Sequence, residues 1–130
     1  MTETKKKKLV LVVDDQPRVL TFVEIDLKLR GFEVITTVSG EKALEIINAR
    51  KPDVMLLDMI MPGMSGGQAF DLLKSINPDI KVILSSGYSL NDDAARILKQ
   101  GCNGFIQKPF DIITLSKKIR SVLESDSHAS

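Results

Sequence analysis

Short apolar runs alternate with amphipathic stretches along the whole chain. Five of the runs predict strands, because they are short, rich in branched aliphatic residues and bounded by polar or turn-forming residues. Three of them are apolar at nearly every position, which is typical of parallel strands covered by helices on both faces. The predicted strands span residues 8–14, 32–37, 53–58, 80–86 and 103–108.

Apolar positions spaced three or four residues apart predict a helix after each strand. Pro17 suits the first turn of the first helix, and Gly31 suits its C-terminal end. Ser39 and Asp111 stand where they can cap the second and fifth helices. The other start and stop signals are Pro52 after the second helix, Ser65, Gln68 and Pro78 around the third, and Asn91 and Gly101 around the fourth.

Strands that alternate with helices predict a doubly wound α/β domain, with a parallel sheet between two layers of helices. No internal repeat or linker interrupts the alternation, so the 130 residues predict one domain. We assign it to residues 8–124. A lysine-rich lead-in at residues 1–7 is expected to be disordered, and a polar tail at residues 125–130, which carries the lone His128, is expected to fray.

Composition and charge limit the classes of function that the sequence can have. The net charge of +1 includes the lysine block at residues 5–8, and the rest of the chain has 14 basic against 17 acidic residues. This mildly acidic body predicts no direct binding of nucleic acid, although the lysine block leaves an anionic partner open as the less favoured alternative. Cys102 is the single cysteine and no apolar run reaches membrane-spanning length, so we expect a cytoplasmic protein with no membrane contact.

The apolar run "DVMLLDMIMPG" ends its predicted strand on a carboxylate, Asp58. Burying an unpaired charge is costly, so Asp58 is expected at the open end of the strand or beside converging partners. Parallel sheets bind ligands at the carboxyl ends of their strands. If strands one, three, four and five are neighbours, that edge brings together Asp58, Asp14, Asp15 and Lys108. It also brings in one serine hydroxyl, from Ser85 or Ser86.

Three clustered carboxylates raise the pKa of at least one of them unless a cation is bound. Mg²⁺ takes oxygen ligands and fits such a set. A carboxylate beside Mg²⁺, a lysine and a hydroxyl can accept a phosphoryl group, because the carboxylate is the nucleophile and the cations neutralise the phosphoryl oxygens.

Four motifs at the strand ends, "VVDD", "LLDMIMPGMSG", "SSGY" and "QKPF", resemble the receiver domains of response regulators in two-component signalling. The resemblance runs in order over nearly the whole chain. It implies a flavodoxin-like (β/α)5 fold with strand order 2-1-3-4-5. It also implies a switch of a two-component or phosphorelay pathway, which takes its phosphoryl group from a phosphohistidine of a histidine kinase or a histidine phosphotransfer protein.

The resemblance also implies roles for single residues. Asp58 is the expected phosphoacceptor, and Mg²⁺ is expected on Asp14, Asp15, Asp58 and the backbone carbonyl of Ile60. Lys108 is expected to pair with the phosphoryl group, across a Lys108–Pro109 bond that the family usually makes cis. For the two acids after the first strand, helix capping remains an alternative, although capping does not need both.

The switch residues follow from the same resemblance. Counting back from Lys108, we assign the hydroxyl to Ser86, which precedes Gly87, and Ser85 stays open as the alternative. Phe105 matches the switch aromatic, with plain core packing as its alternative. On phosphorylation Ser86 is expected to bond a phosphoryl oxygen and Phe105 to move, which alters the face formed by the fourth helix, fifth strand and fifth helix.

Ile60 and Tyr88 occupy the positions that flank the path of the hydrolytic water in receivers. Ile60 has no group that orients a water, and Tyr88 is bulky enough to crowd the in-line approach. We therefore expect slow self-dephosphorylation. The alternative is that both side chains merely pack at the surface and leave the water path open.

Three other functions fit the sequence less well. A haloacid-dehalogenase-type phosphatase needs a second Asp at the position of Ile60, and a dinucleotide-binding module needs a glycine-rich turn where the chain has "DDQPR". A degenerate receiver would not need all the site residues. The favoured prediction is a switch that catalyses only its own phosphorylation and slow dephosphorylation, as a monomer or a phosphorylation-linked dimer. The output partner, and whether the domain is free-standing or part of a hybrid kinase or larger regulator, stay open.

Overall fold

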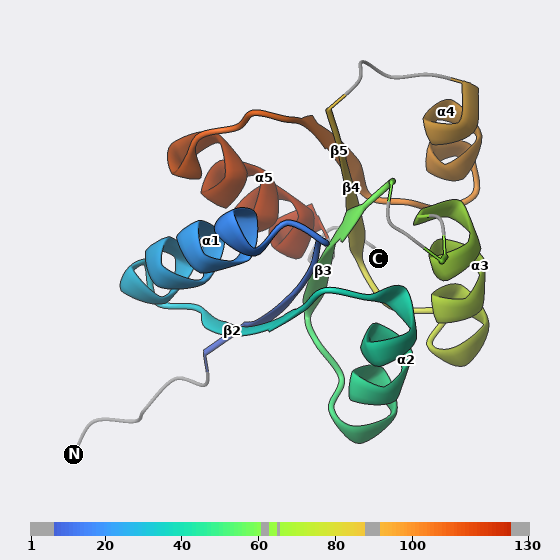
Figure 1. The fold of residues 1–130 in the computed structure, drawn as a ribbon, viewed down its shortest axis with the longest axis horizontal. Coiled ribbons are helices and arrows are strands. Elements are labelled where there is room, and N and C mark those ends of the chain that lie inside the picture. Colours follow the sequence, from blue (N-terminus) through green and yellow to red (C-terminus); the bar gives the residue numbers. More distant parts are fainter. Residues whose placement is uncertain (1–6, 61–62, 65, 88–91, 126–130) are drawn as a thin grey trace.

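The computed structural model describes residues 7–60, 63–64, 66–87 and 92–125. Five parallel strands form one sheet in the order β2-β1-β3-β4-β5 and alternate with five helices (Figure 1). This confirms the predicted flavodoxin-like α/β fold and its strand order. The elements are β1 Leu9–Val13, α1 Pro17–Leu29, β2 Glu33–Thr37, α2 Gly40–Ala49, β3 Val54–Asp58, α3 Gly66–Ile76, β4 Val82–Ser86, α4 Asp92–Lys99, β5 Gly104–Gln107 and α5 Ile112–Ser125.

Helices cover both faces of the sheet. α1 and α5 lie together on one side, while α2, α3 and α4 lie on the other (Figure 1). Every residue of β1, β3 and β4 is buried, as their continuous apolar sequences predict. In the described part of the chain, no helix is long and apolar enough to cross a membrane.

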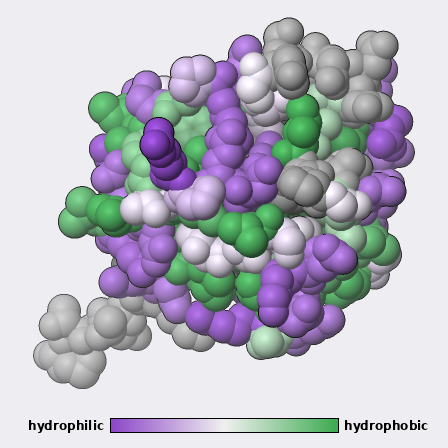
Figure 2. Space-filling model, viewed as in Figure 1, coloured by the Kyte–Doolittle hydropathy of each residue, from purple (hydrophilic) through white to green (hydrophobic). Residues whose placement is uncertain are grey.

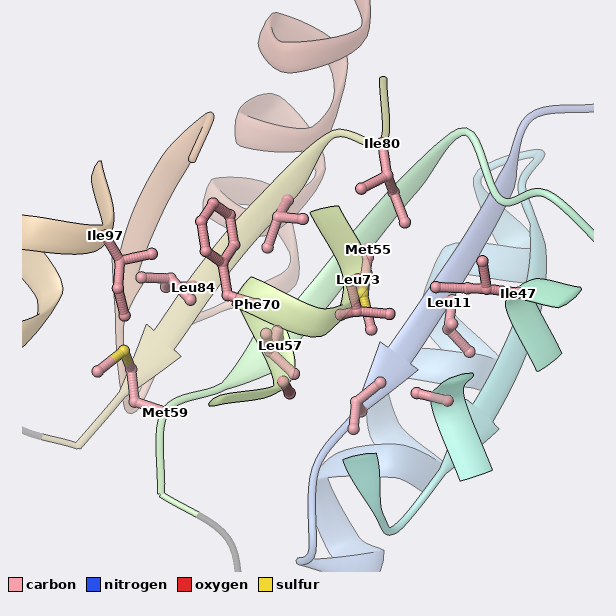
Figure 3. Packing of buried hydrophobic residues seen from close by; sticks show 14 of the residues in the cluster. Leu11, Ile47, Met55, Leu57, Met59, Phe70, Leu73, Ile80, Leu84 and Ile97 are labelled. Carbon is pink, nitrogen blue, oxygen red and sulfur yellow. The ribbon is translucent and has the colours of Figure 1, made fainter. Parts of the chain in front are cut away.

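Alternation along the strands divides the core into two clusters. Leu11, Leu57 and Leu84 face α2, α3 and α4, where Phe70 and Leu73 of α3 pack on them (Figure 3). The residues next to them in sequence, such as Val12, Leu56 and Ile83, face α1 and α5. Each fully buried side chain of this size contributes about 1.5–3 kcal/mol by leaving water. The two clusters therefore fix the sheet rigidly from both sides.

The strands are one or two residues shorter than predicted at several ends, yet the backbone ladder continues past two of them. The Asp14 N–H donates to the Thr37 carbonyl at 3.1 Å, one residue beyond β1. The Lys108 N–H donates to the Ser86 carbonyl at 2.7 Å, one residue beyond β5. Both of these polar residues are therefore held by the sheet although they lie just outside its strands.

The helix ends agree with the predicted signals that fall within the described residues. Ser39 Oγ accepts from the Lys42 N–H at 3.1 Å, and Asp111 Oδ1 accepts from the Thr114 N–H at 2.7 Å. The bond from Thr114 holds the pKa of Asp111 below its usual value. Gly31 has φ +98°, the left-handed conformation that ends α1. The predicted caps Ser65 and Asn91 lie outside the described residues.

Candidate functional site

Three carboxylates meet at the carboxyl ends of β1 and β3. One oxygen from each of Asp14, Asp15 and Asp58 lies within 4.8 Å of the others. Asp14 is 2% exposed and Asp58 is 4% exposed, whereas Asp15 is only partly buried. The structure therefore brings together the acidic residues that the sequence placed at one edge, and it buries two of them.

Lys108 provides the cation beside these acids. Its Nζ lies 2.6 Å from Asp14 Oδ2 and 3.4 Å from Asp58 Oδ2. The Lys108–Pro109 bond is cis, as the resemblance implies. In this structure the lysine is thus closer to Asp14 than to the expected phosphoacceptor, a preference that the sequence did not indicate.

Local backbone bonds orient the two buried carboxylates. Asp14 Oδ1 accepts from the Gln16 N–H at 2.9 Å, and Asp58 Oδ1 accepts from the Ile60 N–H at 3.3 Å. In each case the other oxygen faces Lys108. The N-cap of α1 is Gln16, whose side chain makes no capping bond, so the alternative in which Asp14 and Asp15 serve only as helix caps is not supported.

The site disfavours ionisation of Asp58. Burial, and after it the charge of Asp14, raise the pKa of Asp58 from its ordinary value of 3.8 to about 6, although Lys108 and the Ile60 N–H oppose the rise. Lys108 therefore offsets the repulsion among the carboxylates only in part, since its ammonium also contacts Asp14. A second cation at this edge would remove the remaining cost.

The donor set fits a hard divalent ion. Three carboxylates supply oxygen atoms within 4.8 Å of one another, and oxygen is the ligand type that Mg²⁺ requires. Ile60 is tied to Asp58 through its N–H, so its backbone lies beside the acids. Asp14, Asp15 and Asp58 could therefore hold Mg²⁺, with the Ile60 carbonyl as a candidate fourth ligand.

Two buried serines end β4. The strand register pairs Ser85 with Asp58 and pairs Ser86 with Gln107. Because side chains alternate along a strand, the register puts Ser85 on the sheet face of Asp58, and Ser86 one residue further toward the carboxyl edge. The Ser86 carbonyl accepts from the Lys108 N–H, which ties this serine to the site through the backbone.

The remaining predicted residues are placed as follows. Phe105 is partly buried and packs against the core cluster of α2, α3 and α4. Ile60 is 56% exposed, so its side chain stands at the surface next to the acids. Tyr88 lies outside the described residues.

A cavity of about 590 Å³ beside Lys108 was not predicted from the sequence. It lies where α1 meets the segment after β5. Figure 2 shows that hydrophobic and hydrophilic residues are interspersed over the face that it presents. The available signals were Phe22, which lies outside the buried stripe of its helix, and a second Phe directly after Pro109. Its lining residues are Gln16, Arg18, Val19, Phe22, Gly87, Lys108, Pro109 and Phe110.

Comparison with known proteins gives one consistent family. The model of the response regulator receiver domain matches residues 10–120. The transcriptional regulatory protein PrrA of Mycobacterium tuberculosis is 36% identical over 114 residues, which cover 88% of this chain and 49% of that protein. The heme response regulator HssR of Staphylococcus aureus is 34% identical over 113 residues, 87% of this chain and 50% of that protein. The chain therefore spans about half the length of these curated relatives.

Solved structures of receiver domains have the same fold as this chain. A CheY-like response regulator receiver domain protein from Methanospirillum hungatei superposes with a TM-score of 0.90 and 25% identity, covering 96% of this chain and 100% of that one. The receiver domain of NtrX from Brucella abortus gives a TM-score of 0.84 and 30% identity, covering 89% of this chain and 98% of that one.

The raised pKa of Asp58 predicts how stability depends on pH in metal-free buffer. Because the folded-state pKa of about 6 exceeds the ordinary 3.8, ionisation of Asp58 penalises the folded state. The penalty is absent below the lower value and complete above the higher one. Asp58→Asn should therefore increase the free energy of unfolding by about 3 kcal/mol at neutral pH. The gain should shrink as the pH falls through 6 toward 4.

Urea unfolding in the presence of a chelator, at a series of pH values, measures this difference. Asp71→Asn, at an exposed carboxylate on α3, is the control and should show no such trend. A gain from Asp58→Asn that stays constant or grows toward low pH would contradict the assignment of a raised pKa.

Proposed function

The chain belongs to the family of response regulator receiver domains, and from this membership and its acidic site we propose that it is a phosphoacceptor switch of a two-component or phosphorelay pathway. Receiver domains are signalling switches rather than enzymes that turn over separate substrates. The observation that carries the proposal is the meeting of Asp58 with two further carboxylates and Lys108 at one edge of the sheet.

Asp58 is the proposed nucleophile. One of its carboxylate oxygens attacks the phosphorus of a phosphohistidine, the N–P bond breaks, and the imidazole nitrogen keeps the electron pair and takes a proton. The Lys108 ammonium lies 3.4 Å from Asp58 Oδ2, so a short movement brings it to the phosphoryl oxygens. There it neutralises charge that builds up in the transition state.

Asp14 and Asp15, with Asp58 and the Ile60 carbonyl, are the proposed ligands of Mg²⁺. The bound ion supplies positive charge that the phosphoryl oxygens need and that the three acids lack in its absence. With Mg²⁺ bound, Asp14 would have a second cationic partner, and Lys108, whose Nζ lies 2.6 Å from Asp14 Oδ2, would be available to Asp58.

Ser86 and Phe105 are the proposed switch pair. Ser86 lies one residue nearer the carboxyl edge than Ser85, and its carbonyl is bonded to Lys108 N–H, so its hydroxyl can turn toward a phosphoryl group on Asp58. Phe105 is only partly buried, which leaves it room to move. Its movement would alter the face formed by α4, β5 and α5, the proposed surface for the output partner.

The proposed partners follow from the family. A histidine kinase or a histidine phosphotransfer protein is the proposed phosphodonor, and the cytoplasm is the proposed location of this exchange. PrrA is a transcriptional regulatory protein, and its matched part is half of its length, so an output domain or a separate output protein is proposed here as well. The receiver itself is proposed to act without membrane or direct nucleic-acid binding, as a monomer or a phosphorylation-linked dimer.

Phosphoryl uptake tests the proposal. Incubation with acetyl phosphate and Mg²⁺ should add one phosphoryl group to the wild-type chain, and Asp58→Asn should gain none, because no other acid is flanked by the site residues. Intact-mass spectrometry measures both. If Asp58→Asn takes up phosphoryl at the wild-type rate, Asp58 is not the phosphoacceptor.

The same assay separates the two serines. Ser86→Ala should load severalfold more slowly, because it loses a hydrogen-bond donor to the phosphoryl oxygens, a loss of about 1 kcal/mol. Ser85→Ala is the matched control and should load at close to the wild-type rate. Slower loading of Ser85→Ala than of Ser86→Ala would transfer the role to Ser85.

Slow hydrolysis of the phosphorylated state is the third prediction of this proposal. Ile60 is 56% exposed beside Asp58 and offers a water no hydrogen bond. Ile60→Asn should therefore speed dephosphorylation by about tenfold, since an oriented amide can position the attacking water. The decay of phosphorylated protein after donor removal, with Mg²⁺ present, measures the effect.

Tyr88→Ala is the second arm of the decay measurement, because Tyr88 is proposed to crowd the same water path. Leu72→Asn, at an exposed apolar position on α3, is the control for surface polarity and should leave the decay unchanged. Decay no faster than wild type in both Ile60→Asn and Tyr88→Ala would show that neither side chain shields the acyl phosphate.

A further inference from the structure

A groove of about 370 Å³ lies between α2 and α3, two helices that pack beside each other on the side of the sheet away from α1 and α5 (Figure 1). Its lining residues are Glu41, Gly63, Met64, Gln68, Asp71 and Leu72. None of these residues belongs to the acidic site or to the face formed by α4, β5 and α5. The proposed function therefore gives this groove no role.

Close packing of α2 against Met64 fixes one end of the groove. A Cβ atom added to Gly40, the first residue of α2, would lie 3.0 Å from Met64 Sδ and 3.5 Å from Ala69 Cβ. The absence of that atom lets the helix approach Met64, whose side chain is partly buried against the core cluster of α2, α3 and α4. Because a thioether adapts its shape to what contacts it, this end of the groove suits a docked side chain.

Apolar side chains continue from Met64 along the outside of α3. The helix buries Phe70 and Leu73 in the core (Figure 3). Leu72 is 43% exposed, and Ile76, four residues further on, is 44% exposed. Side chains four residues apart share one face of a helix, so Leu72 and Ile76 form an apolar stripe that begins in the groove. The core uses the other face of α3, which leaves this stripe available to a partner.

Carboxylates border this apolar floor on both helices. Glu41 of α2 and Asp71 of α3 line the groove and are exposed, and Glu45 is exposed one turn after Glu41. Among the described residues that line the groove, none is a lysine or an arginine. Lys74, the lysine of α3, donates from its Nζ to the Ile80 carbonyl at 3.2 Å instead of pairing with these acids. The groove therefore combines an apolar floor with negatively charged edges.

We infer that this groove is a docking site for a basic amphipathic helix of a partner protein. Aliphatic side chains of such a helix would cover Met64, Leu72 and Ile76, and its lysines or arginines would pair with the bordering carboxylates. The 11 residues of α3 extend about 16 Å, which matches roughly three turns of a helix laid along them.

Charge selects the class of partner. Negatively charged edges repel nucleic acid and anionic lipid, and they attract a basic protein segment. The groove shares no residue with the acidic site, so this partner is distinct from the phosphodonor and from an output partner on α4, β5 and α5. The inference thus goes beyond the proposed function and does not depend on phosphorylation of Asp58.

The test uses a designed helical peptide with leucine on one face and lysine on the other, about five turns long. Two matched peptides keep the same pattern, one with glutamate in place of every lysine and one with glutamine in place of every leucine. Amide chemical shifts of the isotope-labelled full chain report where each peptide binds and how tightly. The lysine–leucine peptide should shift amides of α2 and α3, and both matched peptides should bind at least about tenfold more weakly.

Variants assign the binding to the groove. Leu72→Gln should weaken the lysine–leucine peptide by about fivefold, because it removes part of the apolar floor. Glu41→Gln should weaken it by about two- to threefold and reduce the effect of added salt, because an exposed ion pair contributes little and is screened. Leu29→Gln is the matched control: Leu29 is exposed on α1 and does not line the groove, so this variant should bind with wild-type affinity.

Shifts confined to α1 or to the face of α4, β5 and α5 would overturn the docking site, as would wild-type affinity in Leu72→Gln or equal binding of the glutamate peptide. The lysine block at residues 5–8 is the segment of this chain with the matching charge. If combined Lys5→Gln, Lys6→Gln and Lys7→Gln substitutions shift the amides of the groove without peptide, the block itself fills the groove and the partner is overturned. A shift that also depends on protein concentration would assign the block to a second copy. None of these outcomes bears on phosphoryl uptake by Asp58.

Discussion

The contact of one lysine with two buried carboxylates organises the site. Lys108 Nζ lies 2.6 Å from Asp14 and 3.4 Å from Asp58, and both acids are almost fully buried. A single ammonium cannot neutralise two carboxylates and a third, Asp15, beside them. Burial, and after it the charge of Asp14, raise the pKa of Asp58, and Lys108 offsets this rise only in part. The site therefore has more negative than positive charge, and both proposed ligands, Mg²⁺ and a phosphoryl group, change this balance.

The sheet holds this unfavourable cluster in place. β1 and β3 are apolar at every position up to the acids, and core side chains fix them from both faces. Ladder bonds that continue past the strand ends hold Asp14 and Lys108, and backbone N–H groups hold one oxygen of each buried acid. Rigid placement prevents the carboxylates from separating to relieve their repulsion. The free energy gained by burying the core therefore offsets the electrostatic repulsion among the carboxylates of the site.

Some of this arrangement could be predicted from the sequence and some could not. Asp58 was identifiable because a charge at the end of an apolar run needs a reason, and Asp14 and Lys108 because strand ends in a parallel sheet share one edge. The preference of Lys108 for Asp14 was not predictable, since it depends on differences of less than 1 Å between side-chain atoms. The cavity was missed because Phe22 and Phe110 are far apart in sequence and meet only when α1 packs beside the segment after β5. The pairing of Ser85, rather than Ser86, with Asp58 required the strand register.

The central claim about the site is that Mg²⁺ binding offsets the repulsion among the three acids. Mg²⁺ titration of the wild type and of Asp15→Ala, with thermal unfolding followed in the same samples, measures affinity and stability together. Asp15 is the least buried of the three, so its removal leaves the core intact. Asp15→Ala should lose most of the Mg²⁺ affinity, yet be as stable as wild type or more stable when no metal is present. Undiminished Mg²⁺ affinity in Asp15→Ala, or a clear loss of its metal-free stability, would contradict a site in which Mg²⁺ offsets the repulsion among the three acids.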